Sequence, residues 1–509
     1  MIRGLKPPAS VSRDPEGFAI SAFNSTVIPD PRRWWALAVI ALTQLVVVLD
    51  ATIVNVALPQ AQLDLGMSDT ERQWVITAYV LAFGALLLLG GRIADFWGRR
   101  RSYMVGMLGF GLASAWGGLA HSGLELIIAR GLQGAFAALL APAALALLTV
   151  TFPSGRERGT AFAVFGTVAG TGAAVGLLLG GVLTEFGDWR WCLLVNIVFA
   201  VVGLVGALLF VSESRADGDH SYDIAGTITV TLGLGALVYG FTLSEIGWTS
   251  ISTIGFLALG VGLLALFVWI QSRVANPLLP LRVVQDRTRA GAFLIQAIVG
   301  AVFIGMTLYM AFHLQIVMGL SPLWAGLASL GMTIATILAA PLAAKLLPKW
   351  GARVLMSGGP LIAAIGMFYL TFITADGSYW TQVLPGLLLV GFGLAFVVIP
   401  VQNVALTNIA GHDAGAASAL VNASMQIGGS IGLSVFTTIY VGTTADSVAA
   451  GSGQLVAFTD GYSAVFLATT IVLVIASIVA VTMIRGAKPV DEPVADEPSE
   501  GAVAELSHA

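Results

Sequence analysis

Asp50 is the strongest candidate for chemistry in this chain, because it is an acid inside a long apolar segment. It lies in the stretch LDATIVNVALP, roughly 25 Å along a helix counted from Arg33 at about 1.5 Å per residue. A carboxylate at membrane depth costs at least about 2.5–3.5 kcal/mol and is a functional candidate by default. We expect Asp50 to bind and release a proton or a substrate. The alternative is a structural acid held by hydrogen bonds.

Arg130 is the second candidate, in the stretch ARGLQGAFAALLAP, with Gln133 beside it and Gly134 one turn further on. An arginine at membrane depth needs a partner or water. Asp50 is the only acid at comparable depth, so we predict a proton-coupling pair of Asp50 and Arg130 across a central cavity. The alternative is that Arg130 is anchored near the membrane surface through Glu125.

A third group of residues is the charged run GRIADFWGRRR, which lies between two apolar segments. So many charges require a loop at the membrane surface. We predict that Asp95, Arg99 and Arg100 form a gate by pairing across the ends of two halves of the molecule, with Gly91 and Gly98 shaping the loop. The alternative is a basic loop that only sets the orientation of the chain.

Composition places these residues in a polytopic membrane protein. The 509 residues are 57% hydrophobic and only 10% charged, against about 25% charged residues in soluble domains. The net charge of −4, without a basic patch, argues against nucleic acid as a partner. The single cysteine, Cys192, excludes an intrachain disulfide. We expect no metal or cofactor and no enzymatic activity, since neither an HExxH motif nor an ATP-binding Gly-x-x-x-x-Gly-Lys motif occurs.

Fourteen apolar segments are long enough to be transmembrane helices. Of the 24 Lys and Arg residues, all but Arg72, Arg130 and Arg190 fall in the N-terminus, the even-numbered loops or the C-terminus. This bias predicts that both termini are cytoplasmic. The predicted spans are 34–58, 74–91, 103–120, 124–150, 160–183, 191–212, 224–243, 252–272, 290–316, 323–346, 353–373, 380–406, 415–441 and 462–485.

Two internal repeats divide these helices. Trp97-Gly98 recurs 253 residues later as Trp350-Gly351, and Gly172 and Gly176 recur 256 residues later as Gly428 and Gly432. Such an offset spans eight helices rather than six, which predicts two six-helix halves with two extra helices between them. The predicted organisation is a cytoplasmic N-terminal segment (1–33), an N-terminal half (34–212), an inserted pair with linkers (213–289), a C-terminal half (290–485) and a disordered acidic cytoplasmic tail (486–509).

The chain resembles the major facilitator superfamily, and within it the fourteen-helix drug:proton antiporters of the EmrB/QacA type. The loop signature of the superfamily matches at Gly91, Asp95, Gly98, Arg99 and Arg100. The helix 1 motif of the antiporters matches Leu49-Asp50-Ala51-Thr52, Asn55 and Ala57-Leu58-Pro59, and their helix 4 motif matches Arg130, Gln133 and Gly134. The resemblance covers nearly the whole chain, and it implies a role for Arg130 in proton transfer.

Two further sets of residues complete the candidates. The glycines of the fifth helix form a helix-packing motif, but the proline that the family places there is Leu177, which weakens the inference of antiport. These glycines are Gly172, Gly176, Gly180 and Gly181. The residues that we expect to line a substrate cavity are Asn55, Gln133, Gly134, Gln315, Asn422 and Gln426.

The sequence therefore predicts an all-α membrane protein with the major facilitator fold and fourteen transmembrane helices. We expect a monomeric multi-pass exporter of the bacterial cytoplasmic membrane, with protons and a small amphipathic molecule as its partners and the lipid bilayer around it. The alternative is uptake of a small metabolite, by proton coupling or by facilitated diffusion, on the same fold.

Overall fold

The computed structural model describes residues 32–152, 155–215, 223–243, 247–274, 277–406 and 414–485, which form helices and no strands. Within these ranges, twelve helices are long and apolar enough to cross a membrane. The predicted tail 486–509, and the predicted N-terminal segment except Arg32 and Arg33, lie outside the described residues.

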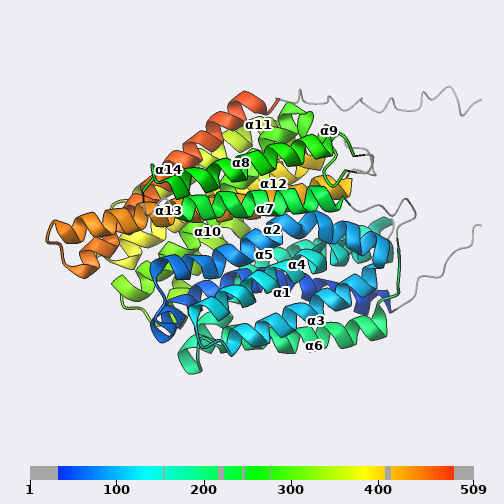
Figure 1. Ribbon diagram of the computed structural model, residues 1–509, viewed down its shortest axis with the longest axis horizontal. Helices are drawn as coiled ribbons and strands as arrows, with labels where there is room; N and C mark the ends of the chain where they lie inside the picture. The colour runs from blue at the N-terminus through cyan, green and yellow to red at the C-terminus, as the bar shows by residue number, and fades with distance from the viewer. Residues whose placement is uncertain are drawn as a thin grey trace, which may run out of the picture.

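The long helices lie side by side in one bundle (Figure 1). Two of the elements, η2 and η3, are single π-helical turns. The bounds are α1 Arg33–Leu65, α2 Asp69–Trp97, α3 Arg99–Gly118, α4 Gly123–Thr151, α5 Gly155–Phe186, α6 Trp191–Phe210, α7 Ile224–Thr242, α8 Ile251–Gln271, α9 Leu281–Gln285, α10 Arg287–Phe312, η2 His313–Val317, α11 Pro322–Leu370, η3 Tyr379–Val383, α12 Leu384–Leu406, α13 Ala414–Ala449 and α14 Gln454–Met483.

Several helices extend beyond the spans predicted from hydropathy. α2 begins before the predicted 74–91 span, because Ser68 and Glu71 cap its first turn reciprocally. The Ser68 hydroxyl accepts the Glu71 N–H at 3.2 Å, and the Glu71 carboxylate accepts the Ser68 N–H at 2.9 Å. α14 likewise begins eight residues before the predicted 462–485 span. Apolar content marks the membrane-facing part of a helix, whereas backbone hydrogen bonding continues into the polar residues beyond it.

Two glycines with left-handed backbone conformations occupy corresponding places. Gly98, with φ 122°, separates α2 from α3. Gly351, with φ 76° and ψ 161°, interrupts the 49-residue α11 between the two spans predicted there. Positive φ values favour glycine, which explains why the Trp-Gly dipeptide is kept in both copies of the repeat.

The same packing pattern occurs twice in the molecule. α1 packs against α5 and α6, while α2 and α3 both pack against α4. In the second set, α10 packs against α13 and α14, and α11 packs along α12. We call α1–α6 the N-terminal group and α10–α14 the C-terminal group.

The two groups meet along two seams, where α2 packs against α13 and where α5 packs against α11. α7 and α8 form a pair beside the groups, and α7 contacts both α2 and α13 (Figure 1). We call the end of the bundle where α1 begins and α14 ends the terminal end, and the opposite end the far end. The outward faces are apolar, as expected for contact with lipid: Leu209 of α6 is 62% exposed and Ile251 of α8 is 92% exposed.

Candidate functional site

Asp50 lies at the centre of a buried hydrogen-bonded cluster in the N-terminal group. Its side chain is fully buried on α1. The guanidinium of Arg130, on α4, donates to Oδ2 at 2.6 Å. The amides of Gln133 on α4 and Asn196 on α6 donate to Oδ1 at 3.2 and 2.7 Å. Three donors, one of them cationic, therefore surround this carboxylate.

Arg130 has partners besides Asp50. Its Nε donates to the carbonyl oxygen of Val75 on α2 at 3.2 Å, and its Nη1 also donates to Oε1 of Gln133 at 3.0 Å. The guanidinium carbon lies 4.3 Å from the centre of the Tyr79 ring, a cation–π distance. A buried guanidinium normally requires an anion. Here two carbonyl oxygens and an aromatic face contact the guanidinium in addition to the Asp50 carboxylate.

Asp50 and Arg130 form the predicted pair, but they touch directly inside one helix group and not across a central cavity. α1 and α4 pack together, and this packing brings the two side chains into contact. Glu125 is not the partner of Arg130. Its carboxylate accepts the N–H of His121 at 2.9 Å, near the start of α4.

Two residues of the cluster, Asn196 and Ser114, were not among the predicted site residues. Ser114 of α3 accepts a hydrogen bond from Nε2 of Gln133 at 2.6 Å. Asn196 is the one amide in the apolar helix Trp191–Phe210, and that isolation was a signal available in the sequence. Ser114 gave no comparable signal, since small hydroxyl residues are common in membrane helices.

The residues predicted to line a substrate cavity do not lie together. Gln133 belongs to the Asp50 cluster. Gly134 lies against the Tyr79 backbone where α4 meets α2, so it permits close packing of these helices rather than lining a cavity. Asn55 is buried on α1, and its amide donates to the carbonyl of Ala51 on the same helix at 3.3 Å.

The other three cavity candidates lie in the C-terminal part of the chain. Nε2 of Gln315 donates to the carbonyl oxygen of Val56 on α1 at 3.0 Å, which links the two groups. Gln426 packs near Gly84 on the seam between α2 and α13. Asn422 is exposed on α13. These positions separate the six candidates into an interior set and a set at or near the boundary between the groups.

The predicted gating loop is held by its own group in this conformation. Asp95 pairs with Arg99 one turn later at 2.8 Å. Arg100 donates to the carbonyl oxygens of Ala207 and Leu208, at 3.1 and 2.9 Å, at the end of α6. The Glu213 carboxylate accepts the N–H groups of Arg100 and Arg101, at 3.1 and 3.2 Å. The expected pairing across the two halves is thus replaced here by contacts inside the N-terminal group.

The remaining loop glycines have steric roles. Gly98 faces the Glu213 carboxylate, where a Cβ atom would lie 2.8 Å from an oxygen. Gly91 lies near Pro142 of α4 with ordinary van der Waals space. A side chain at Gly98 is therefore disfavoured mainly by the positive φ, because the Glu213 carboxylate can shift, whereas a Cβ atom is tolerated at Gly91.

The α5 glycines pack against α1 in register. Cβ atoms at Gly172, Gly176 and Gly180 would meet successive turns of α1, at Val48, at Leu49 with Thr52, and at Ile53. Gly181 faces the other way, against Pro322 and Leu323 of α11. The repeat partners behave alike, since Gly428 and Gly432 lie against Ala297 and Ala301 of α10. Small residues at this spacing allow helix backbones to approach closely.

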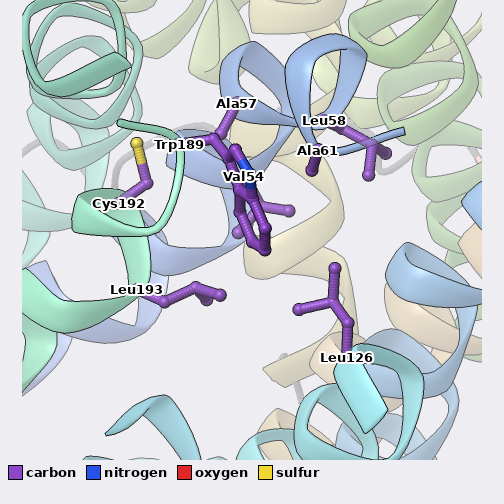
Figure 2. A pocket seen from close by; sticks show the side chains of 8 residues that line it. All are labelled: Val54, Ala57, Leu58, Ala61, Leu126, Trp189, Cys192 and Leu193. Atoms are coloured by element: carbon purple, nitrogen blue, oxygen red, sulfur yellow. The ribbon is translucent and has the colours of Figure 1, made fainter. Parts of the chain in front are cut away.

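A small apolar cavity lies beside the Asp50 cluster (Figure 2). It is lined by side chains of α1, α4 and α6 and by Trp189, which precedes α6. Val54 contributes to its wall one turn beyond Asp50. No polar group is available there to orient a ligand other than the Trp189 indole and the Cys192 thiol, and these contact Asp64 and Thr184. The lining residues are Val54, Ala57, Leu58, Ala61, Leu126, Trp189, Cys192 and Leu193.

Hydrogen bonds close the far end between the two groups. On one seam, Nε2 of Gln73 donates to Oγ of Ser434 at 2.8 Å. On the other, the Glu185 carboxylate of α5 accepts the Ser321 hydroxyl at 2.6 Å and the Leu323 N–H at 3.0 Å. Glu185 thereby caps the first turn of α11, a helix of the opposite group.

Comparison with known proteins identifies the architecture. Residues 40–433 match the model of the Major Facilitator Superfamily. The puromycin resistance protein pur8 of Streptomyces alboniger is 47% identical over 436 residues, which cover 85% of this chain and 87% of that protein. The cephamycin export protein CmcT of Amycolatopsis lactamdurans is 36% identical over 422 residues, which cover 81% of this chain and 86% of that protein. The crystal structure of a bacterial homologue of the human lysosomal transporter Spinster superposes with a TM-score of 0.63 at 17% identity, covering 90% of this chain and 99% of that one.

Proposed function

The chain belongs to the major facilitator superfamily, and from this premise we propose that it exports amphipathic drugs or secondary metabolites across the bacterial cytoplasmic membrane in exchange for protons. Relatives that align with more than four fifths of the chain are named for puromycin resistance and cephamycin export. One name describes resistance to an antibiotic and the other describes its export, which supports export over the alternative of uptake.

The observation that carries proton coupling is the buried Asp50–Arg130 pair. Transfer of a proton to Asp50 removes the negative charge next to Arg130. The Val75 carbonyl, the Gln133 amide oxygen and the Tyr79 ring remain within reach of the guanidinium. The cluster therefore has partners for both protonation states of one carboxylate, as a reversible proton site requires.

Coupling to protons supplies enough free energy for export. One charge moving through 100 mV contributes about 2.3 kcal/mol. This corresponds to roughly a fiftyfold concentration gradient of a neutral solute per proton. In the proposed cycle, the two helix groups rock about their seams and expose the space between them alternately at the terminal end and the far end.

We further propose fourteen membrane spans, with α7 and α8 as an inserted pair between two six-helix halves and both termini in the cytoplasm. Two observations add to the twelve long apolar helices. Gly351 divides α11 into two segments, and the 20-residue α3 packs inside the N-terminal group like its neighbours. The concentration of Lys and Arg in loops at the terminal end supports a cytoplasmic location for that end.

Transport into inverted membrane vesicles tests the proposal. The assay follows uptake of amphipathic dyes and antibiotics together with proton release, under an imposed pH gradient. We expect wild type to exchange substrate for protons and Asp50→Asn to lose the exchange. The control is Asp64→Asn on the same helix, because the Asp64 side chain is 49% exposed at the far end. Transport without proton movement, or an active Asp50→Asn variant, would refute proton coupling.

A further inference from the structure

Arg72 is a second buried cation, and the Asp50 cluster does not use it. It lies in the first turns of α2, at the far end, and is 2% exposed. Its guanidinium carbon lies 4.2 Å from the centre of the Phe312 ring and 5.5 Å from that of Tyr440. Phe312 ends α10 and Tyr440 lies on α13, so a side chain of the N-terminal group enters an aromatic site of the C-terminal group.

The partners of Arg72 divide sharply between the two groups. Its ion pair with Asp69, at 2.9 Å, and its hydrogen bond to Oε1 of Gln62, at 3.2 Å, stay within the N-terminal group. Both aromatic partners belong to the C-terminal group. When the groups separate at the far end, Arg72 can keep its counter-ion and its hydrogen bond to Gln62, and it leaves the Phe312 and Tyr440 side chains.

The aromatic site is built from several rings, which we call the aromatic cage: Phe312, Tyr309, Tyr440 and Tyr462. Tyr440 and Tyr462 stack at 5.2 Å with an interplanar angle of 10°, and Tyr309 lies 5.4 Å from Tyr440. The Tyr309 hydroxyl is fixed by Thr437 at 2.8 Å. Packing among α10, α13 and α14 thus holds the cage together without Arg72.

A buried polar side chain without a full set of hydrogen-bond partners lies next to the aromatic cage. His313 meets Tyr462 edge-on at 5.9 Å and is 1% exposed. Within the described part of the chain, Nδ1 of His313 is buried and has no hydrogen-bond partner. Buried polar atoms without partners are costly, and they are expected where a ligand or water binds in another state.

We propose that the aromatic cage binds the cationic group of a transported substrate, and that Arg72 occupies the cage while the far end is closed. The Arg72 guanidinium indicates the class of ligand, because aromatic faces attract other organic cations as they attract guanidinium. Arg72 and a substrate ammonium group exclude each other from the same ring faces. Return of Arg72 therefore expels the cation as the far end closes. This inference rests on the export cycle proposed above.

Binding of a matched pair of probes tests the proposal without any transport. The probes are diphenylhexatriene, which is neutral, and its trimethylammonium derivative, which carries a quaternary cation on the same apolar body. Their affinities for the full-length protein in lipid nanodiscs are measured by energy transfer from tryptophan, with empty nanodiscs as the blank. The readout is the ratio of the cationic to the neutral affinity, which cancels changes in general access to the site.

Loss of a ring should lower this ratio. We expect Phe312→Leu and Tyr440→Leu to reduce it by between about twofold and thirtyfold, the range that one cation–π contact supports. Tyr440→Phe keeps the ring and should keep the ratio. Arg72→Gln removes the competing occupant and should raise the ratio. Size-exclusion profiles and unfolding temperatures identify any variant that fails to fold, and the remaining variants still decide the question.

Two results would overturn the proposal. An unchanged ratio in the ring-loss variants would show that the cage does not bind the cation. An unchanged ratio in Arg72→Gln would show that Arg72 only latches the two groups together. Asp50→Asn is expected to retain the cation preference even though it abolishes proton exchange. If proton coupling proves absent, the binding test still decides whether the aromatic cage binds the cation. If the aromatic cage does not bind the cation, the transport test still decides whether substrate and protons are exchanged.

Discussion

Replacing Asp50 and Arg130 separately and together should reveal strong energetic coupling between them. Both side chains are buried, at 0% and 1% exposure, and their atoms lie 2.6 Å apart. Asp50→Leu leaves a buried guanidinium without an anion, which should lower the free energy of unfolding by about 3–5 kcal/mol. Arg130→Met should cost only about 1.5–3 kcal/mol, because the carboxyl group can take up a proton and keeps the amides of Gln133 and Asn196.

The double variant should be more stable than the single changes imply. With both charges gone, the remaining cost is the loss of one hydrogen-bond partner at the Gln133 amide, which keeps Ser114, and at the Asn196 amide, about 1–2 kcal/mol each. We therefore expect the double variant to cost about 3 kcal/mol less than the sum of the single variants. All three variants should lose proton exchange. The double variant should therefore regain part of its stability without regaining transport.

Equilibrium unfolding of the purified protein in mixed micelles provides the measurement. The control cycle uses Arg33 and Glu157, whose 2.7 Å ion pair is partly exposed at the terminal end. We expect a coupling energy below about 1 kcal/mol there. Additive effects of the Asp50 and Arg130 variants, or a cost for Arg130→Met that exceeds the cost for Asp50→Leu, would refute the reasoning.

Three further predictions concern single positions. Asn196→Leu removes a 2.7 Å hydrogen bond to Asp50 and should lower the free energy of unfolding by about 1.5–3 kcal/mol and weaken proton exchange; unchanged exchange would exclude Asn196 from the proton site. Gly176→Ala should lower the unfolding temperature because a Cβ meets the α1 backbone, whereas Gly166→Ala, with open space, should not; equal shifts would contradict the packing argument. Glu185→Gln weakens the contact of α5 with the start of α11, so hydrogen exchange should rise severalfold at their far ends but not at the terminal end of α5.

Hydropathy and repeats were enough to predict the positions of the helices. The spans expected at 323–346 and 353–373 lie on either side of Gly351, and the glycine ladder of α5 packs as its spacing suggested. These features depend on the period of a helix and on residue size, which are local properties. They can be inferred without knowing which helices become neighbours.

The contents of the site were less predictable, because they depend on how helices rotate and cross. Asp50 and Arg130 were recognised by their charge, but the donation from Asn196 exists only because α6 presents that face to α1. Gly134 looked like a cavity residue, yet it lies at a helix crossing. The interpretation of Asp95, Arg99 and Arg100 as a gate stays a prediction, since it concerns contacts in a conformation other than this one.

The position of α7 makes the two seams between the helix groups mechanically unequal. α7, which belongs to neither group, touches both α2 and α13, whereas among the described residues no helix from outside the two groups packs across the seam of α5 and α11. Any movement that widens the first seam must detach α7 from at least one of its two neighbours. The seam of α5 and α11 lacks that restraint among the described residues. A molecule built from two similar halves is therefore connected asymmetrically, with its extra helix pair attached along one side only.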